Sequence, residues 1–267
     1  MSICKSLFLL GVLALCSFVS PLLGQEQSKP PQRDPTLLEV LTRVVQTAGG
    51  AQALSAVHGL SETGEITFHW TKDVKGPVSV RSFEGNHFRM EADLPEGNRV
   101  WVVRDGHGSR KESDKKAVEL PYSNAINLGN LTFPVAHVAS ALSDPKTDVS
   151  LVSIEKEEGR SIYHLRLRGR LGLVGTGTPA GTFVKEIFVD ALTFDILKVE
   201  DFPYRRVSNG KPSDIAPRAI SYADFRFVNG VKIPFSIETK LEGQPTFSIS
   251  IREAAFNNNL SESDFTN

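Results

Sequence analysis

The chain has 267 residues, of which 40% are hydrophobic and 23% are charged, and its 30 Lys and Arg residues nearly balance 31 Asp and Glu residues. This apolar content suits the core of one or two globular domains, and it is too low for a protein with many membrane spans. The formal net charge of -1, without a dense Lys/Arg run, gives no long-range attraction to phosphates, which argues against nucleic-acid binding.

The N-terminal segment has the order of a secretory signal peptide. Residues 1–5 carry a positive charge at Lys5, and residues 6–23 form an uncharged, mainly apolar stretch. We predict a signal peptide over residues 1–24, cleaved after Gly24, and a flexible polar linker over residues 25–33. An uncleaved anchor is the alternative, because the apolar stretch nearly reaches the ~18 residues that a membrane-spanning helix needs.

Cysteine usage supports export. Both cysteines, Cys4 and Cys16, lie inside the predicted signal peptide, so the mature chain contains neither a disulfide nor a thiolate. A chain of this length buries enough surface to be stable without disulfides. The pattern favours a bacterial periplasm.

The first elements predicted after the linker are two helices. Asp34 is positioned to cap a helix with Pro35 in its first turn. Apolar residues then recur at helical spacing on one face: Leu37, Leu38, Leu41, Val44, Val45 and Ala48. Gly49-Gly50 ends this helix, and residues 51–57 predict a short second helix with Leu54 and Val57 facing inward.

From Glu65 onward, period-two alternation predicts strands. The predicted strands cover residues 65–70, 78–83, 88–92, 100–103, 150–154, 163–167, 183–190, 196–201, 219–227, 231–240 and 246–252. One further helix is predicted over residues 132–142, with Thr132 as its cap. Asn229-Gly230 is the clearest hairpin signal, because both turn positions need positive φ. The predicted class is α+β, mostly β, with one antiparallel sheet of ten or eleven strands and three helices.

Motifs for catalysis are absent or lack their context. The glycine-rich segment 169–181 leads into a strand rather than into the helix that a phosphate loop needs. Several carboxylates lie in turns or on polar strand faces, where solvation is expected: Asp190, Asp195, Asp201 and Asp224. We therefore predict no enzyme activity and no cofactor.

The six histidines are scattered singly, and the mature chain offers no cysteine for a zinc site. We predict no metal. A cluster of His87, His107 and a carboxylate around a bound metal is the observation that would favour an enzyme instead.

One predicted strand has a basic face. His164, Arg166, Arg168 and Arg170 alternate with Tyr163, Leu165, Leu167 and Gly169. One interpretation is an anionic head-group site formed by Arg166 and Arg168. The other is a solvated outer face, on which arginines protect the sheet from edge pairing.

Residues 36–70 predict a helix, a Gly-Gly break, a short helix and a strand, with Gly64-Glu65-Ile66-Thr67-Phe68 in that strand. This order of elements resembles the opening of the LolA-like family of periplasmic outer-membrane lipoprotein carriers. Residues 183–200 resemble two strands joined at an Asp-x-x-Thr turn, and residues 220–239 resemble an Asn-Gly hairpin followed by Ile-Pro. The resemblance covers residues 37–265, and the chain departs from it in a long polar insertion around residues 205–218.

The resemblance implies a single domain over residues 34–267, built as a strongly curved, unclosed antiparallel barrel with helices covering its opening. Its apolar hollow would receive acyl chains of lipoproteins or other lipids. The candidate lining residues are Phe225, Phe227, Ile233, Phe235, Phe247 and Ile249. Alternation does not show which face of the sheet is concave, and core packing explains these residues equally well.

The function that follows from the resemblance is a monomeric periplasmic carrier of acyl chains, with outer-membrane lipoprotein sorting and envelope membrane complexes as the associated role and partners. The alternative is an envelope structural or partner-docking module without a ligand. A hollow of several hundred Å³ favours the carrier. A closed core with an exposed apolar patch favours the docking module.

Overall fold

The computed structural model describes residues 33–69, 71–144, 147–157, 159–170, 182–202, 204–206 and 212–266. The predicted signal peptide, the predicted linker up to residue 32, Trp70 and residues 171–181 of the glycine-rich segment lie outside these residues. Among the described residues, none of the helices combines the length and the apolar character needed to span a membrane.

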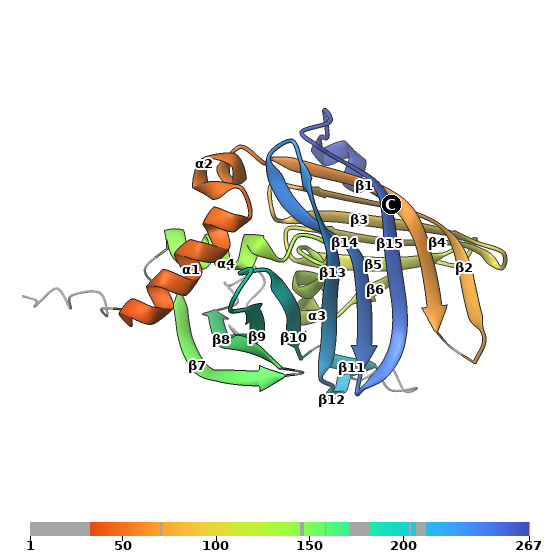
Figure 1. Cartoon of the computed structure of the whole chain (residues 1–267). Coiled ribbons are helices and arrows are strands. Elements are labelled where there is room, and N and C mark those ends of the chain that lie inside the picture. Colours follow the sequence, from red (N-terminus) through yellow and green to blue (C-terminus); the bar gives the residue numbers. More distant parts are fainter. Residues whose placement is uncertain are drawn as a thin grey trace, which may run out of the picture. The chain divides into compact units, whose positions relative to one another are not determined.

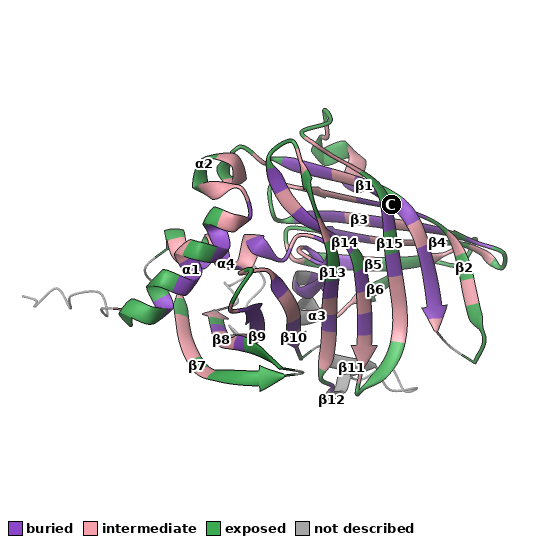
Figure 2. Ribbon diagram, in the orientation of Figure 1, coloured by how far each residue is buried: buried purple, intermediate pink, exposed green. Residues whose placement is uncertain are grey.

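Helix α1 (Pro35–Thr47) forms as predicted. The Asp34 carboxylate accepts hydrogen bonds from the backbone N–H groups of Thr36 (2.7 Å) and Leu37 (3.1 Å), which caps the helix. Its buried face consists of Leu37, Val40, Leu41, Val44 and Val45. The prediction was wrong for Leu38, which is 44% exposed because it lies about 100° around the helix from Leu37. Figure 2 shows the two faces of α1.

The Gly-Gly break leads into helix α2 (Gly50–Ser55) and brings the end of α1 against a distant hairpin. The backbone N–H of Lys232 donates to the carbonyl oxygen of Ala48 at 3.0 Å. Gly49 has φ +120°, and a Cβ atom at this position would overlap the carbonyl oxygen of Gly230. The break therefore provides both a backbone conformation and a close contact that favour glycine.

Within the described residues, thirteen strands form one antiparallel sheet, in the order β6-β5-β4-β3-β2-β1-β15-β14-β13-β10-β9-β8-β7 (Figure 1). The members are β1 (Gly59–His69), β2 (Asp73–Phe83), β3 (His87–Leu94), β4 (Gly97–Arg104), β5 (His107–Glu112), β6 (Val118–Leu120), β7 (Asp148–Glu157), β8 (Arg160–Arg170), β9 (Thr182–Asp190), β10 (Ile196–Asp201), β13 (Arg218–Val228), β14 (Val231–Leu241) and β15 (Gln244–Phe256). The last strand, β15, pairs with the first, β1. Because β6 and β7 are edges, the sheet is not closed, as predicted.

The structure contains more helices and strands than were predicted from the sequence. Strands β5 and β6 and helix α3 (Tyr122–Leu128) were not predicted, and the insertion forms a separate two-stranded sheet of β11 (Tyr204–Arg206) and β12 (Pro212–Ile215). Helix α4 (Val135–Ser143) begins three residues later than predicted. Its N-cap is Pro134, without a side-chain hydrogen bond, so Thr132 is not the cap and is instead buried.

Two predicted turns have the expected geometry. Asn229 and Gly230 connect β13 to β14 with φ values of +45° and +84°, as a type I′ hairpin turn requires. In the turn from β9 to β10, the carboxylate of Asp190 accepts hydrogen bonds from the backbone N–H groups of Leu192 and Thr193, both at 2.8 Å. This is the Asp-x-x-Thr turn.

The C-terminal segment ends in a short 3-10 helix, η1 (Glu262–Phe265), beside β3 and β4. Phe265 is 1% exposed and lies against the rings of Phe83 and His87, with centroid distances of 6.3 and 5.4 Å. Arg104 forms an ion pair with Glu262 at 2.7 Å. These contacts attach the C-terminal segment to the sheet.

Candidate functional site

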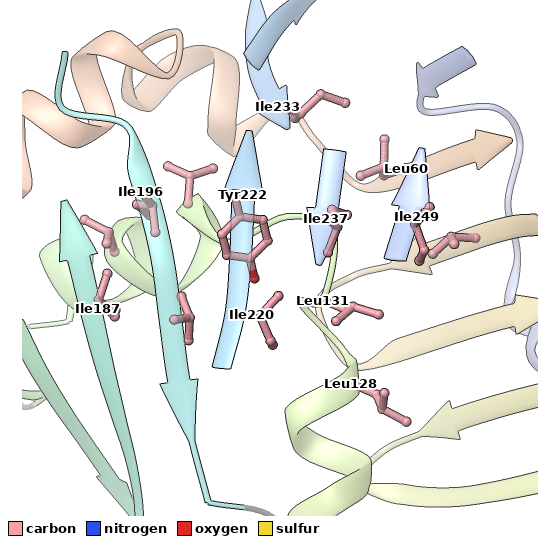
Figure 3. Close-up of a cluster of buried hydrophobic side chains, with 14 of the residues drawn as sticks. Leu60, Leu128, Leu131, Ile187, Ile196, Ile220, Tyr222, Ile233, Ile237 and Ile249 are labelled. Atoms are coloured by element: carbon pink, nitrogen blue, oxygen red, sulfur yellow. The ribbon is translucent and has the colours of Figure 1, made fainter. Parts of the chain in front are cut away.

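The interior of the fold is a set of apolar rows that run across the sheet. The register places Ile66, Ile249, Ile237 and Tyr222 side by side on β1, β15, β14 and β13, and each is at most 4% exposed. A neighbouring row consists of Ile187, Val199 and Ile220 on β9, β10 and β13. Figure 3 draws members of both rows together with Leu128 and Leu131. Adjacent side chains in such rows lie close enough to form a continuous apolar surface.

Helices and the loop before α4 cover this surface. Leu128, Leu131, Val135 and Val138 are buried in the same cluster as the rows, together with the inner face of α1. These side chains pack against the surface that the resemblance implied to line an apolar hollow. The interior is therefore packed where it faces the helices.

Two cavities in the described part of the chain lie at the edges of the cover. The α2–α4 cavity has about 180 Å³ and is lined by Leu54, Val57, Leu60, Phe83, Phe133, Ala136 and Ala139, among others. The α1–α4 cavity has about 20 Å³, and its lining includes Val44, Ala48, Phe133, Val135 and Ile196. Phe133 lines both cavities. Both are smaller than the roughly 300–1,000 Å³ of typical ligand pockets.

An open groove of about 760 Å³ lies where strands β10 and β13 separate. These strands pair only between Lys198↔Ser221 and Asp201↔Arg218. Asp195 and Phe225 line both this groove and the α1–α4 cavity. The ammonium group of Lys232 pairs with the Asp195 carboxylate at 2.5 Å, which joins β14 to the turn between β9 and β10.

Three ionic side chains, Lys185, Asp201 and Arg218, lie beside the Ile187 row on the interior face of the sheet, and we call them the ionic row. Arg218 lies opposite Asp201 in the register, and its Nε atom donates to Asp201 Oδ1 at 2.9 Å and its second nitrogen to Oδ2 at 2.5 Å. Lys185 Nζ lies 3.7 Å from Asp201 Oδ2 and donates to Asn127 Oδ1 at 2.9 Å. The Lys185 and Asp201 side chains are 3% and 0% exposed. Burial lowers the pKa of Lys185 to about 8, although Asp201 opposes this shift.

Two more titratable groups with shifted pKa values lie on α4 or beside the loop that precedes it. Glu62 is 2% exposed, and neither of its carboxylate oxygens has a hydrogen bond of good geometry within the described residues. Burial raises the pKa of Glu62 to about 8, and the Thr132 hydroxyl opposes part of this shift. On α4, desolvation and the charge of Lys185 hold the pKa of His137 well below its ordinary value. Strongly shifted groups of this kind are candidates for functional residues.

The predicted lining residues occupy three environments. Ile233, Phe235 and Ile249 are buried in the core at 0–5% exposure, and Phe225 and Phe247 are half-buried against it. Phe227 is 64% exposed. Asp224 on β13 has φ +53°. Before it, Ile220 and Tyr222 are buried, whereas after it Phe225 is half-buried. The single apolar face expected for β13 is therefore interrupted.

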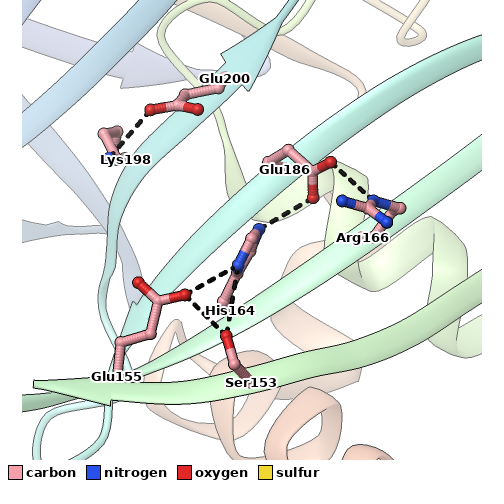
Figure 4. A network of polar contacts seen from close by, with 7 residues as sticks. All are labelled: Ser153, Glu155, His164, Arg166, Glu186, Lys198 and Glu200. Atoms are coloured by element: carbon pink, nitrogen blue, oxygen red, sulfur yellow. Dashed lines mark hydrogen bonds and ion pairs between the residues drawn. The ribbon is translucent and has the colours of Figure 1, made fainter.

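The basic strand face is paired with carboxylates (Figure 4). Glu186 accepts from Arg166 Nε at 2.6 Å and contacts His164 Nε2 at 2.9 Å, and Glu155 contacts His164 Nδ1 at 3.1 Å. Arg168 lies 3.6 Å from Asp148. These ion pairs neutralise much of the charge that the sequence assigned to Arg166 and Arg168.

The histidines named for a metal site are not brought together. His87 is buried between Phe83 and Phe265, whereas His107 is exposed. Within the part of the chain that the structure describes, no three His, Cys, Asp or Glu residues are grouped as metal ligands.

The comparisons with known proteins identify the fold. No protein-family model and no curated protein sequence matches the chain. Among solved structures, a LolA superfamily protein from Nitrosomonas europaea superposes with a TM-score of 0.52 and 14% identity, over 84% of this chain and 96% of that chain. A domain described as an outer membrane lipoprotein-sorting protein, from Vibrio parahaemolyticus, gives a TM-score of 0.50 and 12% identity, over 85% and 95% of the two chains. A DUF1329 family protein from Desulfovibrio piger also gives 0.50, at 8% identity, over 86% and 96%.

The protein therefore has a LolA-like fold, as the order of its sequence motifs indicated. At these identities the comparisons define the fold alone.

The ionic row was missed by the sequence analysis. Asp201 was expected to be solvated and is instead fully buried, and Asp190 and Asp195 are also largely buried. The local signal was the alternation in β9, which puts Lys185 on the same face as buried Ile187 and Val189. That signal becomes informative only once the helix-facing side of the sheet is known.

Proposed function

We propose that this protein is an exported, periplasmic binding protein that holds the acyl chains of lipoproteins or other amphiphiles beneath its helices. The observation that carries the proposal is the continuous apolar surface across β1, β15, β14, β13, β10 and β9, which is covered by short helices and a loop. Removing each acyl CH₂ group from water contributes about 0.8 kcal/mol. A surface of this kind therefore stabilises a bound chain without any covalent chemistry.

Loading beneath the helices requires the cover to move, because the α2–α4 and α1–α4 cavities are too small for a chain. Helix α4 is the element best placed to do so. It has nine residues, its N-cap lacks a side-chain hydrogen bond, and cavities lie on both sides of the preceding Phe133. A chain that enters the α2–α4 cavity and displaces α4 would replace Val135 and Val138 on the apolar rows.

The fold supports binding rather than catalysis, since the proteins with this fold described above include a lipoprotein-sorting domain. Outer-membrane lipoprotein sorting is the specific role we propose, with a membrane complex as the source of the ligand. The docking alternative has less support, because the three most exposed apolar side chains come from separate segments: Ile154 from β7, Leu192 from the turn between β9 and β10, and Phe227 from β13.

The test is direct binding of an amphiphile. Protein purified from a periplasmic extract is analysed by lipid mass spectrometry, and dodecanoate is titrated against an uncharged fluorescent probe, N-phenyl-1-naphthylamine. We expect a co-purifying amphiphile and displacement of the probe. If no amphiphile co-purifies and dodecanoate does not displace the probe, the docking module becomes the better proposal.

A variant pair locates the site. Ala139 lines the α2–α4 cavity, whereas the next residue on α4, Ser140, is exposed. Ala139→Phe fills the cavity and should weaken dodecanoate binding by about tenfold, a change of about 1.4 kcal/mol. Ser140→Phe adds the same ring to the exposed face and should leave the affinity unchanged. Equal effects of the two substitutions would exclude this cavity as the way in.

A further inference from the structure

The ionic row lies directly beside an apolar row on the same face of the sheet. Arg218 and Asp201 face each other on β13 and β10, and the register that pairs Glu200 with Glu186 puts Lys185 beside Asp201. Two residues further along each strand are Ile220, Val199 and Ile187. Rows two residues apart are separated by about 6.6 Å, so polar and apolar side chains form adjacent bands. This arrangement matches the two ends of an amphiphile.

The ionic row has more positive than negative groups. Lys185 and Arg218 share one carboxylate, that of Asp201, and among the described residues no other carboxylate forms an ion pair with either cation. His137 of α4 is near enough for the charge of Lys185 to lower its pKa, and it can only add positive charge when it is protonated. A buried cation without a full counter-charge is costly. The row therefore has a net positive charge in a place where an anion would be stabilised.

Helix α3 supplies neutral acceptors to both cations. Asn127 accepts from Lys185 through its side-chain oxygen at 2.9 Å and from Arg218 through its backbone carbonyl at 3.1 Å. A carboxylate or phosphate oxygen in place of these acceptors would form charge-assisted hydrogen bonds, which are stronger than bonds to a neutral amide. Asn127 is on a helix of seven residues, so its displacement disturbs a short element.

From this geometry, and on the basis of the proposed binding function, we propose that Lys185 and Arg218 bind the anionic head group of the amphiphile, a carboxylate or a phosphate monoester. Asp201 holds the two cations in position. The first methylene groups of the chain then lie over Ile187, Val199 and Ile220, and Asn127 leaves its present position when the head group binds.

The experiment compares head groups on one chain length. Dodecanoate, monododecyl phosphate, dodecan-1-ol and dodecyltrimethylammonium are each titrated at pH 7 against N-phenyl-1-naphthylamine bound to the protein. We expect at least one of the two anions to bind about tenfold or more tightly than the alcohol, and the cation to bind more weakly than the alcohol. The better of the two anions identifies a carboxylate or a phosphate as the source.

Substitutions then assign the preference to residues. Lys185→Met keeps the length of the side chain and leaves the Arg218–Asp201 pair intact, so it should reduce the anion preference to about threefold or less while the affinity for the alcohol stays the same. Lys198→Met is the matched control, because Lys198 lies on the opposite face of the neighbouring strand and is 28% exposed. It should retain the preference. Arg166→Gln tests the alternative head-group site on the basic strand face.

The outcomes separate this proposal from the proposed function. If no amphiphile binds to the wild-type protein, the binding function itself is wrong. If all head groups bind equally, or if Arg166→Gln removes the preference while Lys185→Met retains it, the binding function stands and the head-group assignment is overturned. Should Lys185→Met fail to fold, the head-group comparison on the wild-type protein, together with Lys185→Gln, still decides the question.

Discussion

Asp201 accepts two hydrogen bonds from the guanidinium group of Arg218, at 2.9 and 2.5 Å, while its side chain is fully buried. Lys185 completes the contact from the other neighbouring strand. One carboxylate thus holds the buried Lys185 and the Arg218 guanidinium group, which is 12% exposed, and connects β9, β10 and β13.

We predict that Asp201→Asn lowers the free energy of unfolding by about 3–5 kcal/mol, because it leaves Lys185 and Arg218 buried without a counter-charge. Urea denaturation at pH 7 measures the effect. The control is Asp224→Asn. The Asp224–Arg226 pair has the same two-point geometry, at 3.0 and 2.6 Å, but its side chains are 48% and 53% exposed. An exposed pair contributes little, so a similar loss in both variants would contradict this account.

A second prediction concerns the contact between α1 and the β13–β14 hairpin. Gly49→Ala should destabilise the protein by about 3 kcal/mol or more, since it combines an unfavourable φ of +120° with overlap between Cβ and the Gly230 carbonyl oxygen. Gly50→Ala is the control. Gly50 also has positive φ, +87°, but a Cβ atom there meets no atom within 4 Å, so a loss of about 1 kcal/mol is expected. Thermal unfolding of both variants compares them, and equal losses would show that the contact is unimportant.

The fold was predictable to the extent that its signals are local. Asn229-Gly230 specifies a turn by its own backbone preferences, and Asp34 specifies the start of α1 in the same way. The pairing of β1 with β15 has no such signal, because it joins residues nearly two hundred positions apart, such as Leu60 and Phe256. Short elements such as α3 and β6 also escaped prediction, since seven or three residues are too few for a period to appear.

The candidate site was less predictable, because it depends on which face of each strand the helices cover. Lys185 and Glu186 are adjacent and point to opposite faces. Lys185 meets Asn127 of α3, whereas Glu186 pairs with Arg166 of β8. The sequence shows the alternation, but the partners come from distant segments. The same uncertainty left two interpretations open for Arg166 and led to the wrong prediction that the Asp201 carboxylate is solvated.

A third prediction concerns Glu62. Its pKa is raised from 4.5 to about 8 by burial, so between these two values the unfolded chain releases a proton that the folded protein retains. The free energy of unfolding of the wild-type protein should therefore decrease as the pH rises from about 4.5 to 8. Glu62→Gln removes this dependence and should gain on the order of 3 kcal/mol relative to the wild type across that range. Urea denaturation at pH 5, 6.5 and 8 measures the difference, and parallel curves would mean that Glu62 is ionised in the folded protein.

The last prediction concerns the charge of Lys185 in ligand binding. The groups that face it are Asp201, Arg218, Asn127 and, from α4, His137. Because the pKa of Lys185 is lowered to about 8, its positive charge is present below that pH and is lost as the pH rises above it. Dodecanoate stays ionised throughout, so its affinity relative to dodecan-1-ol should be greatest near pH 7 and should decrease at pH 9–10.

Bound dodecanoate stabilises the protonated ammonium group, and the midpoint of this decrease should therefore lie above 8. Isothermal titration calorimetry at pH 7, 8, 9 and 10 measures the ratio of the two affinities. In Lys185→Met the ratio should be independent of pH, because Arg218 remains charged throughout and Met carries no proton to lose. A ratio in the wild-type protein that is constant from pH 7 to pH 10 would show that Lys185 does not contact the head group.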